Sequence, residues 1–356
     1  HEADNSSRRL DRPGRLVEGY AKSYRPGAAG QGIPEAFEPA AVSDGLDRVA
    51  APRRMLMRLK VVINPAAGKS ESVLRVLNDT FVPAGIEWDV AITHGPGDGQ
   101  AAARQAADEH YDLVGVYGGD GTVAEVASAL AEVGPPMLLL PGGTGNALAD
   151  DLGIPSDLAA AAALATGDAL SIKRVDLGRW GRRWFVLRMT MGIEVAMVTA
   201  ATRELKDRYG SLAYVFAGLQ ALQGAPVSKY TIVVDGRTFD CEGVAALVAN
   251  SASTGVAGLT IASDVDVSDG VLDVIVIQAV DLAALLGSAK DMAQGQPPRL
   301  VSHWRGAEIH VESSPVQVAL ADGETAGRTP VDVTVAPGAL GVVAPKVALA
   351  AEPEQA

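Results

Sequence analysis

The sequence predicts an α/β domain with a parallel sheet, followed by a second domain built as an antiparallel β-sandwich. Apolar runs alternate with helix-like stretches from about residue 59 to residue 152, which is the pattern of βαβ units. Strand-like segments follow one another with few helices after about Asp176. The 356 residues, of which 48% are hydrophobic, are numerous and apolar enough to bury two cores.

Four segments are expected along the chain. A flexible extension with scattered glycine and proline covers 1–57, and it contains at most a short helix at 16–23. The α/β domain covers 58–176, the β-sandwich domain covers 177–346 and a tail covers the last residues, 347–356.

Short apolar runs and amphipathic stretches define the elements of the first domain. Strands are expected at 60–65, 88–92, 113–117 and 137–140, and helices at 71–78, 100–110, 123–130, 147–152 and 158–165. Connections between parallel strands are right-handed, so the loops after these strands gather at the carboxyl edge of the sheet. The predicted domain is therefore Rossmann-like.

The second domain is expected to consist mainly of antiparallel strands, in a sandwich or a barrel. The strands are expected at 184–189, 230–234, 243–248, 272–277, 308–311, 316–320 and 331–335, and two helical regions at 200–223 and 282–292. A cleft between two domains is a common place for a ligand, so the active site is expected there.

Composition and charge exclude several classes of protein. A net charge of −13 argues against nucleic acid binding, which needs a dense basic surface. No run approaches the roughly 18–20 apolar residues of a transmembrane helix, and no apolar signal region is present, so a cytoplasmic protein with at most peripheral membrane contact is expected. The single cysteine, Cys241, permits no internal disulfide. The histidines show no metal-ligand spacing.

Two glycine-rich turns are the strongest functional signal. One follows the predicted strand at 113–117 and the other follows the strand at 137–140. Strand, glycine turn and helix point backbone N–H groups and a helix N-terminus at an anion, and two such turns together indicate a site for a nucleotide triphosphate. The residues expected to bind it are Gly118, Gly119, Asp120, Gly121 and Thr122 in the first turn and Gly142, Gly143, Thr144 and Asn146 in the second.

Polar side chains in these turns have more than one possible role. Asp120 repels phosphate unless a magnesium ion lies between them, or it accepts bonds from ribose or water. Thr122, Thr144 and Asn146 bond phosphate oxygens, or they only cap helices. Neither turn matches the Walker A motif or the dinucleotide fingerprint, and 67–70 is a third, weaker loop.

Two acidic segments in the second domain supply candidate carboxylates. Asp264, Asp266, Asp269 and Asp273 surround one turn, and Asp322-Gly323-Glu324 forms another. By default the first group is solvated and the second is a hairpin turn. A phosphoryl transferase, however, needs carboxylates that hold magnesium and one that accepts the proton of the attacking hydroxyl.

In order and spacing, these motifs resemble the diacylglycerol kinase catalytic family, which includes soluble bacterial diacylglycerol kinases, sphingosine kinases and ceramide kinases. The resemblance covers the chain from about Leu59 to Pro345. Its motifs are Ile63-Asn64-Pro65 with Gly68, the two glycine turns with Glu125, Asn250 with Gly255 and Gly258, the segment 268–273, and Asp322-Gly323-Glu324 ahead of Thr329-Pro330.

The resemblance implies a lipid kinase that depends on ATP and Mg²⁺, with ATP in the interdomain cleft. The residues that would line the nucleotide site are Asn64, Asp120, Thr122 and Thr144. Asp322 would be the general base, Glu324 would assist the magnesium and phosphate network, and Asp120 would act as a further catalytic and metal-facing residue. Asp269 would bind a structural magnesium ion. The expected acceptor is diacylglycerol and the product phosphatidic acid, in phospholipid biosynthesis.

Two departures from the family pattern concern the acceptor pocket, namely Ser263 and Glu194. A sphingoid base or other lipid alcohol as acceptor and a catalytically silent lipid- or nucleotide-binding protein remain open. An NAD kinase or phosphofructokinase shares the Gly-Gly-Asp-Gly turn, but the loop at 140–146 and the turn Asp322-Gly323-Glu324 argue against both. A lipid acceptor requires transient contact with a membrane, for which the candidates are Lys206, Arg208, Tyr209, Arg299 and Leu300, with a solvated charged face as the alternative. The oligomeric state is left open, a homodimer included.

Overall fold

The computed structural model describes residues 57–67, 72–167, 170–192, 226–256, 259–260, 265–278 and 301–346. The predicted extension up to residue 56, the helical regions at 200–223 and 282–292, and the tail from residue 347 lie outside these residues. The same is true of Glu194, Ser263, Asp264 and the five candidate membrane contacts.

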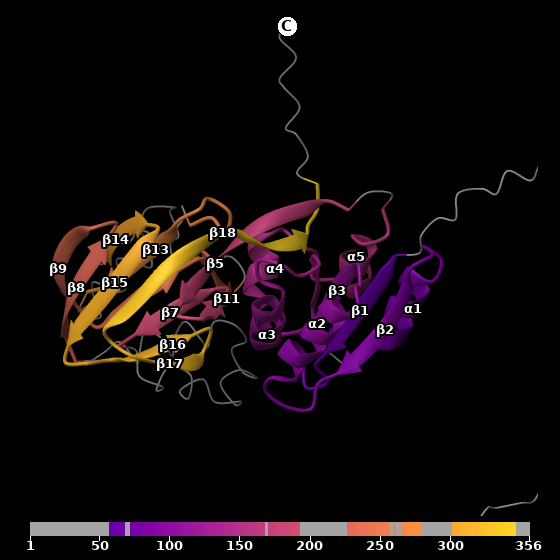
Figure 1. Cartoon of the computed structure of the whole chain (residues 1–356), viewed down its shortest axis with the longest axis horizontal. Helices are drawn as coiled ribbons and strands as arrows, with labels where there is room; N and C mark the ends of the chain where they lie inside the picture. Colours follow the sequence, from indigo (N-terminus) through magenta and orange to yellow (C-terminus); the bar gives the residue numbers. More distant parts are fainter. Residues whose placement is uncertain are drawn as a thin grey trace, which may run out of the picture. The chain divides into compact units, whose positions relative to one another are not determined.

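Parallel strands alternate with helices in the first half of the described chain, as predicted (Figure 1). The strands are β1 (Arg58–Ile63), β2 (Glu87–Ile92), β3 (Leu113–Gly118) and β4 (Met137–Pro141). The helices are α1 (Val73–Phe81), α2 (Asp98–Asp108), α3 (Asp120–Leu130), α4 (Ala147–Asp151) and α5 (Leu158–Ala163). The strand order β2-β1-β3-β4 places the ends of β3 and β4 side by side.

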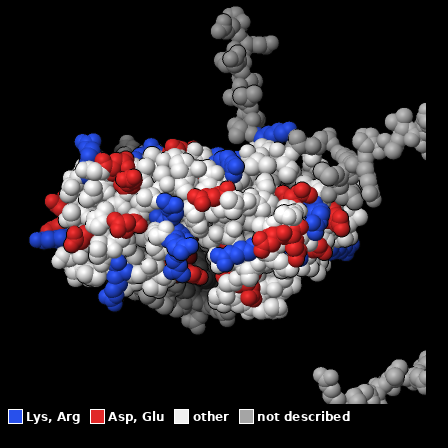
Figure 2. Space-filling view, viewed as in Figure 1, with Lys and Arg blue, Asp and Glu red and all other residues white. Residues whose placement is uncertain are grey.

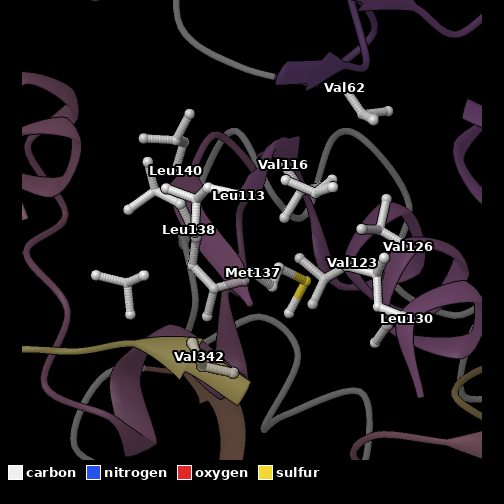
Figure 3. Packing of buried hydrophobic residues seen from close by; sticks show 14 of the residues in the cluster. Val62, Leu113, Val116, Val123, Val126, Leu130, Met137, Leu138, Leu140 and Val342 are labelled. Carbon is white, nitrogen blue, oxygen red and sulfur yellow. The ribbon is translucent and has the colours of Figure 1, made fainter. Parts of the chain in front are cut away.

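The core of this part forms because β3 and β4 are continuous apolar runs, as expected for strands covered on both faces. α3 packs against them with Val123, Val126 and Leu130, which share one face of the helix (Figure 3). Each such side chain contributes about 1.5–3 kcal/mol when fully buried. The same core includes Val342, which comes from the far end of the chain.

The second half of the described chain is rich in antiparallel strands, as predicted. They are β5 (Ile172–Trp180), β6 (Arg183–Phe185), β7 (Arg188–Met191), β8 (Ser228–Val234), β9 (Arg237–Gly243), β10 (Ala245–Ala249), β11 (Ser253–Val256), β12 (Leu259–Thr260), β13 (Leu272–Ile277), β14 (Val301–Gly306), β15 (Glu308–Ser314), β16 (Val318–Ala321), β17 (Glu324–Arg328) and β18 (Val331–Val343). One sheet has the order β14-β13-β10-β7-β16-β17. Its alternate side chains, such as Met191 and Val248, share a core with Ile232 of β8 and Val311 of β15, which is the packing of a sandwich.

The 13-residue strand β18 connects the sandwich to the parallel sheet (Figure 1). It pairs with β15 near its start, and its Val342 pairs in parallel with Met137 of β4. β5 runs antiparallel to β18 and crosses residue 176, where the sequence suggested a boundary. One mixed sheet therefore continues from the α/β part into the β-rich part.

Two predicted strands differ from the structure by more than small shifts of their ends. The strand expected at 331–335 continues to Val343, because an irregularity between Ala336 and Leu340 accommodates a Pro-Gly pair that reads as a strand end in the sequence. The strand expected at 184–189 is divided into β6 and β7. The division occurs because the N–H groups of Val186 and Leu187 bond a side chain instead of a neighbouring strand.

Candidate active site

The two glycine-rich turns lie side by side, because β3 and β4 are neighbouring parallel strands. Gly118 at the end of β3 stands opposite Pro141 at the end of β4. The Gly118 carbonyl accepts N–H bonds from Gly142 and Gly143, each at 3.1 Å. A Cβ atom on Gly143 would lie well inside van der Waals contact with the Gly119 Cα, so this close approach requires a glycine.

Asp120 connects the two turns a second time. It is the first residue of α3, which begins three residues earlier than predicted, directly after Gly119. Its Oδ1 accepts an N–H bond of 2.8 Å from Ala147, the first residue of α4. Burial raises the pKa of the Asp120 carboxyl, while this bond and the charge of Arg188 oppose the shift. Asp120 is therefore a cap for α4, whatever else it binds.

The backbone donors of the second turn differ from the prediction. The N–H groups of Gly142 and Gly143 bond the Gly118 carbonyl, and the Gly143 N–H also bonds Asn146 Oδ1 at 3.0 Å. These two N–H groups therefore hold the turns together and are not aimed at a nucleotide. The N–H groups of Asp120, Gly121 and Thr122 are among the donors available to an anion, because the first turn of α3 has no acceptors within the helix.

Most of the predicted polar side chains around the turns bond other groups of the protein. Asn64, directly after β1, donates through Nδ2 to the Thr122 hydroxyl at 3.0 Å. Asn146 donates through its amide to the Gly143 carbonyl at 2.8 Å, so its side chain closes the second turn. Thr144 is exposed at the tip of that turn, where its hydroxyl is accessible to a ligand.

Asp322 lies in the tight turn between β16 and β17, as the Asp-Gly signal predicted. Asp322 and Gly323 have φ values of 47° and 89°, the positive values that a two-residue hairpin turn needs. The Asp322 carboxylate accepts N–H bonds from Val186 at 2.7 Å, Leu187 at 2.9 Å and Arg188 at 3.0 Å. Burial raises the pKa of Asp322, and these three bonds oppose the shift. Glu324 is exposed at the start of β17.

Arg188, which sequence reasoning missed, interacts with both predicted catalytic aspartates, Asp120 and Asp322. Its backbone N–H bonds Asp322, and its guanidinium Nη2 donates to the Ser253 carbonyl. The charges of Asp322, Asp120 and Asp151 all act on this guanidinium and oppose burial, which lowers the pKa of Arg188. A single cation thus lies within electrostatic range of three carboxylates from both halves of the described chain.

Asp151 at the end of α4 joins α4 to the β-rich part. Its carboxylate accepts a bond from the Ser251 hydroxyl and one of 3.1 Å from the Ser253 N–H. Burial raises the pKa of Asp151, and its bonds with Ser251 and Ser253 and the charge of Arg188 oppose the shift. Asn250, which precedes Ser251, helps to hold this segment in place, because its Nδ2 donates to the carbonyls of Asp176 and Val186, each at 2.8 Å.

Two sequence signals pointed to the residues that were missed. Arg188 is a lone charge inside the apolar stretch 184–191, and a charge in such a run usually has a buried partner. Asp150 and Asp151 form an acidic pair soon after the second glycine turn. Neither signal identifies its partner, because Arg188 and Ser253 are separated by 65 positions in the chain.

The predicted magnesium ligands differ in how well they fit the ion. Magnesium is usually held by one or two carboxylates together with substrate phosphates, and Asp120, close to the charge of Asp150, fits an ion carried by a nucleotide. Asp269 does not fit, because its carboxylate contacts the guanidinium of Arg305 and accepts the Val271 N–H at 3.1 Å. Within the described ranges, no group of three or more His, Cys, Asp or Glu side chains is arranged to hold a metal ion.

The surface shows no concentration of one charge on the face in view. Lys and Arg side chains are interspersed with Asp and Glu side chains there (Figure 2). Among the residues that the structure describes, no helix has the length and apolar character that crossing a membrane requires.

Comparison with known proteins gives two family models that match in succession. The diacylglycerol kinase catalytic domain matches residues 58–180. The YegS C-terminal NAD kinase beta sandwich-like domain matches residues 188–344. These ranges correspond to the α/β part and to most of the β-rich part of the structure.

Individual proteins agree with these models. A diacylglycerol kinase of Bacillus subtilis is 28% identical over 284 residues, which are 77% of this chain and 92% of that protein. The uncharacterized protein sll0036 of Synechocystis is 33% identical over 250 residues, 68% of this chain but only 57% of its own length. The crystal structure of a diacylglycerol kinase from Bacillus anthracis shares the fold, with a TM-score of 0.69 and 24% identity over 82% of this chain and 98% of that one. Residues 58–180 of the chain thus belong to the diacylglycerol kinase catalytic domain, the domain of a phosphotransferase, and residues 188–344 belong to the YegS C-terminal domain.

Proposed function

We propose that the protein is a lipid kinase that transfers the γ-phosphoryl group of ATP, with Mg²⁺, to the hydroxyl of diacylglycerol and so forms phosphatidic acid. The observation that carries this proposal is the bonding of Arg188, whose backbone N–H donates to Asp322 and whose guanidinium donates to the Ser253 carbonyl. The Ser253 N–H in turn bonds Asp151, and the charge of Arg188 also acts on Asp120. Arg188 thus interacts with the turn after β3, where we place the phosphates, and with the turn between β16 and β17, which carries the candidate base Asp322. The relatives named diacylglycerol kinase support this lipid as the acceptor.

The triphosphate is held at the N-terminus of α3, where the first-turn N–H groups and the helix dipole favour an anion. The exposed Thr144 hydroxyl donates to a phosphate oxygen from the other turn. Magnesium, when bound with ATP beside Asp120, spreads the negative charge of the phosphates. The segment 58–176 thus binds the nucleotide, and 177–346 binds the lipid.

Asp322 performs the proton transfer. Its carboxylate accepts the proton of the lipid hydroxyl while that oxygen forms a bond to the γ-phosphorus, and the bond from the γ-phosphorus to the oxygen of ADP breaks. Because burial raises the pKa of Asp322 towards the working pH, the carboxylate is a better base than an exposed aspartate. The exposed Glu324 lies two residues away and supports the phosphate network. The lipid is reached by transient docking of a cytoplasmic protein at a membrane surface.

The test of this function is an assay of the protein with labelled Mg-ATP and a panel of acceptors, with mass analysis of the products. The panel contains diacylglycerol, monoacylglycerol, a sphingoid base, ceramide and NAD. We expect label in phosphatidic acid. Label in another lipid would show that this lipid, and not diacylglycerol, is the acceptor. Label in NADP would contradict lipid kinase activity. ATP binding without any product would indicate a silent binding protein.

Arg188→Met tests the central cation. Removal of its charge leaves three partly buried carboxylates without a shared cation, so we expect kcat to fall about 100-fold, the size of effect typical of a preorganised charge. Arg188→Lys keeps the charge and should retain more activity. Arg179→Met is the matched control, since Arg179 is exposed on β5 and faces Trp184. An unchanged kcat in Arg188→Met would contradict the proposed site.

A further inference from the structure

An acidic turn, residues 265–273, carries Asp266, Asp269 and Asp273, and each of these carboxylates has a protein partner. Asp266 accepts bonds from the Ser268 N–H at 2.9 Å and the Ser268 hydroxyl at 2.7 Å. Lys173 lies 3.8 Å from the same carboxylate. The bond from the Ser268 hydroxyl holds the pKa of Asp266 below its ordinary value. Asp266 is therefore satisfied by its own turn and by one lysine.

The other two carboxylates share one arginine. Arg305 on β14 stands directly opposite Asp273 on β13. Its Nε lies 3.1 Å from Asp273 Oδ1, and its Nη2 contacts Asp269 Oδ2. Asp273 is only 1% exposed, and the ring of His303 is its second partner, at 2.6 Å. A guanidinium presents several N–H donors in one plane, which suits two carboxylates at once.

The backbone of the acidic turn is also attached to the protein. The Gly270 N–H donates to Asp176 Oδ2, and the Gly338 N–H donates to Asp176 Oδ1, each at 2.6 Å. Val267 is 2% exposed and packs in the core of the α/β part. The turn is thus held between β5, the irregular part of β18 and β14 by groups that belong to the chain itself.

We propose that the Arg305 guanidinium is the resident cation of the acidic turn, so that the folded state of this turn does not depend on magnesium. The position where the family resemblance implied a structural Mg²⁺ is neutralised here by an arginine on the neighbouring strand. A charge fixed on the chain remains at low magnesium, whereas a bound ion would leave. Any magnesium requirement of the protein then arises at the nucleotide and not in the β-rich part.

The test is thermal unfolding of the full chain without nucleotide, in EDTA and in millimolar magnesium. For the wild type we expect the same Tm in both. Arg305→Met leaves Asp269 and the buried Asp273 without their guanidinium, so its Tm in EDTA should fall by about 5 °C. Magnesium should then raise the Tm of this variant, because two carboxylates have become available to it.

The controls distinguish this role from a general effect of losing an arginine. Arg75→Met removes an ion pair whose side chains are 80% and 66% exposed on α1, so its Tm should match the wild type. If Arg305→Met fails to fold, Arg305→Lys replaces it, with a lowered Tm and no magnesium response expected, because the charge remains. The readout does not involve activity, so it is independent of the proposed kinase function.

Two results would overturn the inference. One is a wild-type Tm that rises with magnesium and no longer does so in Asp269→Asn, since the ion would then bind at the turn despite Arg305. The other is an Arg305→Met protein as stable as the wild type. A magnesium effect that persists in Asp269→Asn would place the ion elsewhere and would support the inference.

Discussion

Asp322→Asn is expected to reduce turnover by roughly 100- to 10,000-fold, the contribution of a general base, while ATP affinity remains nearly unchanged. The amide cannot accept the proton of the lipid hydroxyl. In the wild type the Val186 N–H bonds Oδ2 of Asp322, and the Leu187 and Arg188 N–H groups bond Oδ1. Asparagine replaces one of these two oxygens by an NH₂ group, which cannot accept an N–H bond. This adds a stability cost of about 1–3 kcal/mol. The measurements are kcat, ATP affinity and Tm.

Asp235→Asn is the matched control, because the chain contains a second turn of the same kind. Asp235 and Gly236 connect β8 and β9 with φ values of 47° and 77°. Asp235 Oδ1 also accepts two backbone N–H bonds, from Ala307 at 3.0 Å and Glu308 at 2.9 Å, and an asparagine oxygen can keep both. We expect full activity from this variant. Activity retained in Asp322→Asn would show that Asp322 only shapes its turn.

Gly143→Ala is expected to abolish nucleotide binding together with activity. The new methyl group would collide with the backbone of Gly119, and backbone cannot move aside as a flexible side chain can. The two turns would separate, and the N-terminus of α3 would lose its position beside the exposed Thr144. We expect the rate to fall at least 100-fold, since a misplacement of about 1 Å in a positioning group costs a factor of that size, and ATP affinity to fall with it. ATP binding by calorimetry measures this loss.

The control for this substitution is Gly95→Ala, at a glycine with open space around its Cβ position and no positive φ. This variant should bind ATP as the wild type does. Gly143→Ala with unchanged ATP affinity would show that the nucleotide does not bind at the paired turns.

Local chemistry made much of the fold predictable. The apolar runs of β3 and β4 and the alanine-rich face of α2 are visible in the sequence, because burial follows the strand and helix periods. The Asp322-Gly323 turn is equally local, since only a few residue types accept positive φ at two successive positions. Local reading failed at β18. Pro337 and Gly338 usually end a strand, but here the strand continues past them through an irregularity in its pairing.

The nucleotide-site motifs, the two-part fold and the candidate base are properties of short segments, so they can be read from the amino acids alone. The partners of these residues are not. Asp322 bonds Val186 across 136 positions, and Asp120 caps α4 across 27. The assignment of Arg305 to the acidic turn, likewise, depends on β14 lying beside β13. Such pairings are decided by strand order and register, because hydrogen bonds and ion pairs act over a few ångströms and only the packed sheets bring these distant groups that close.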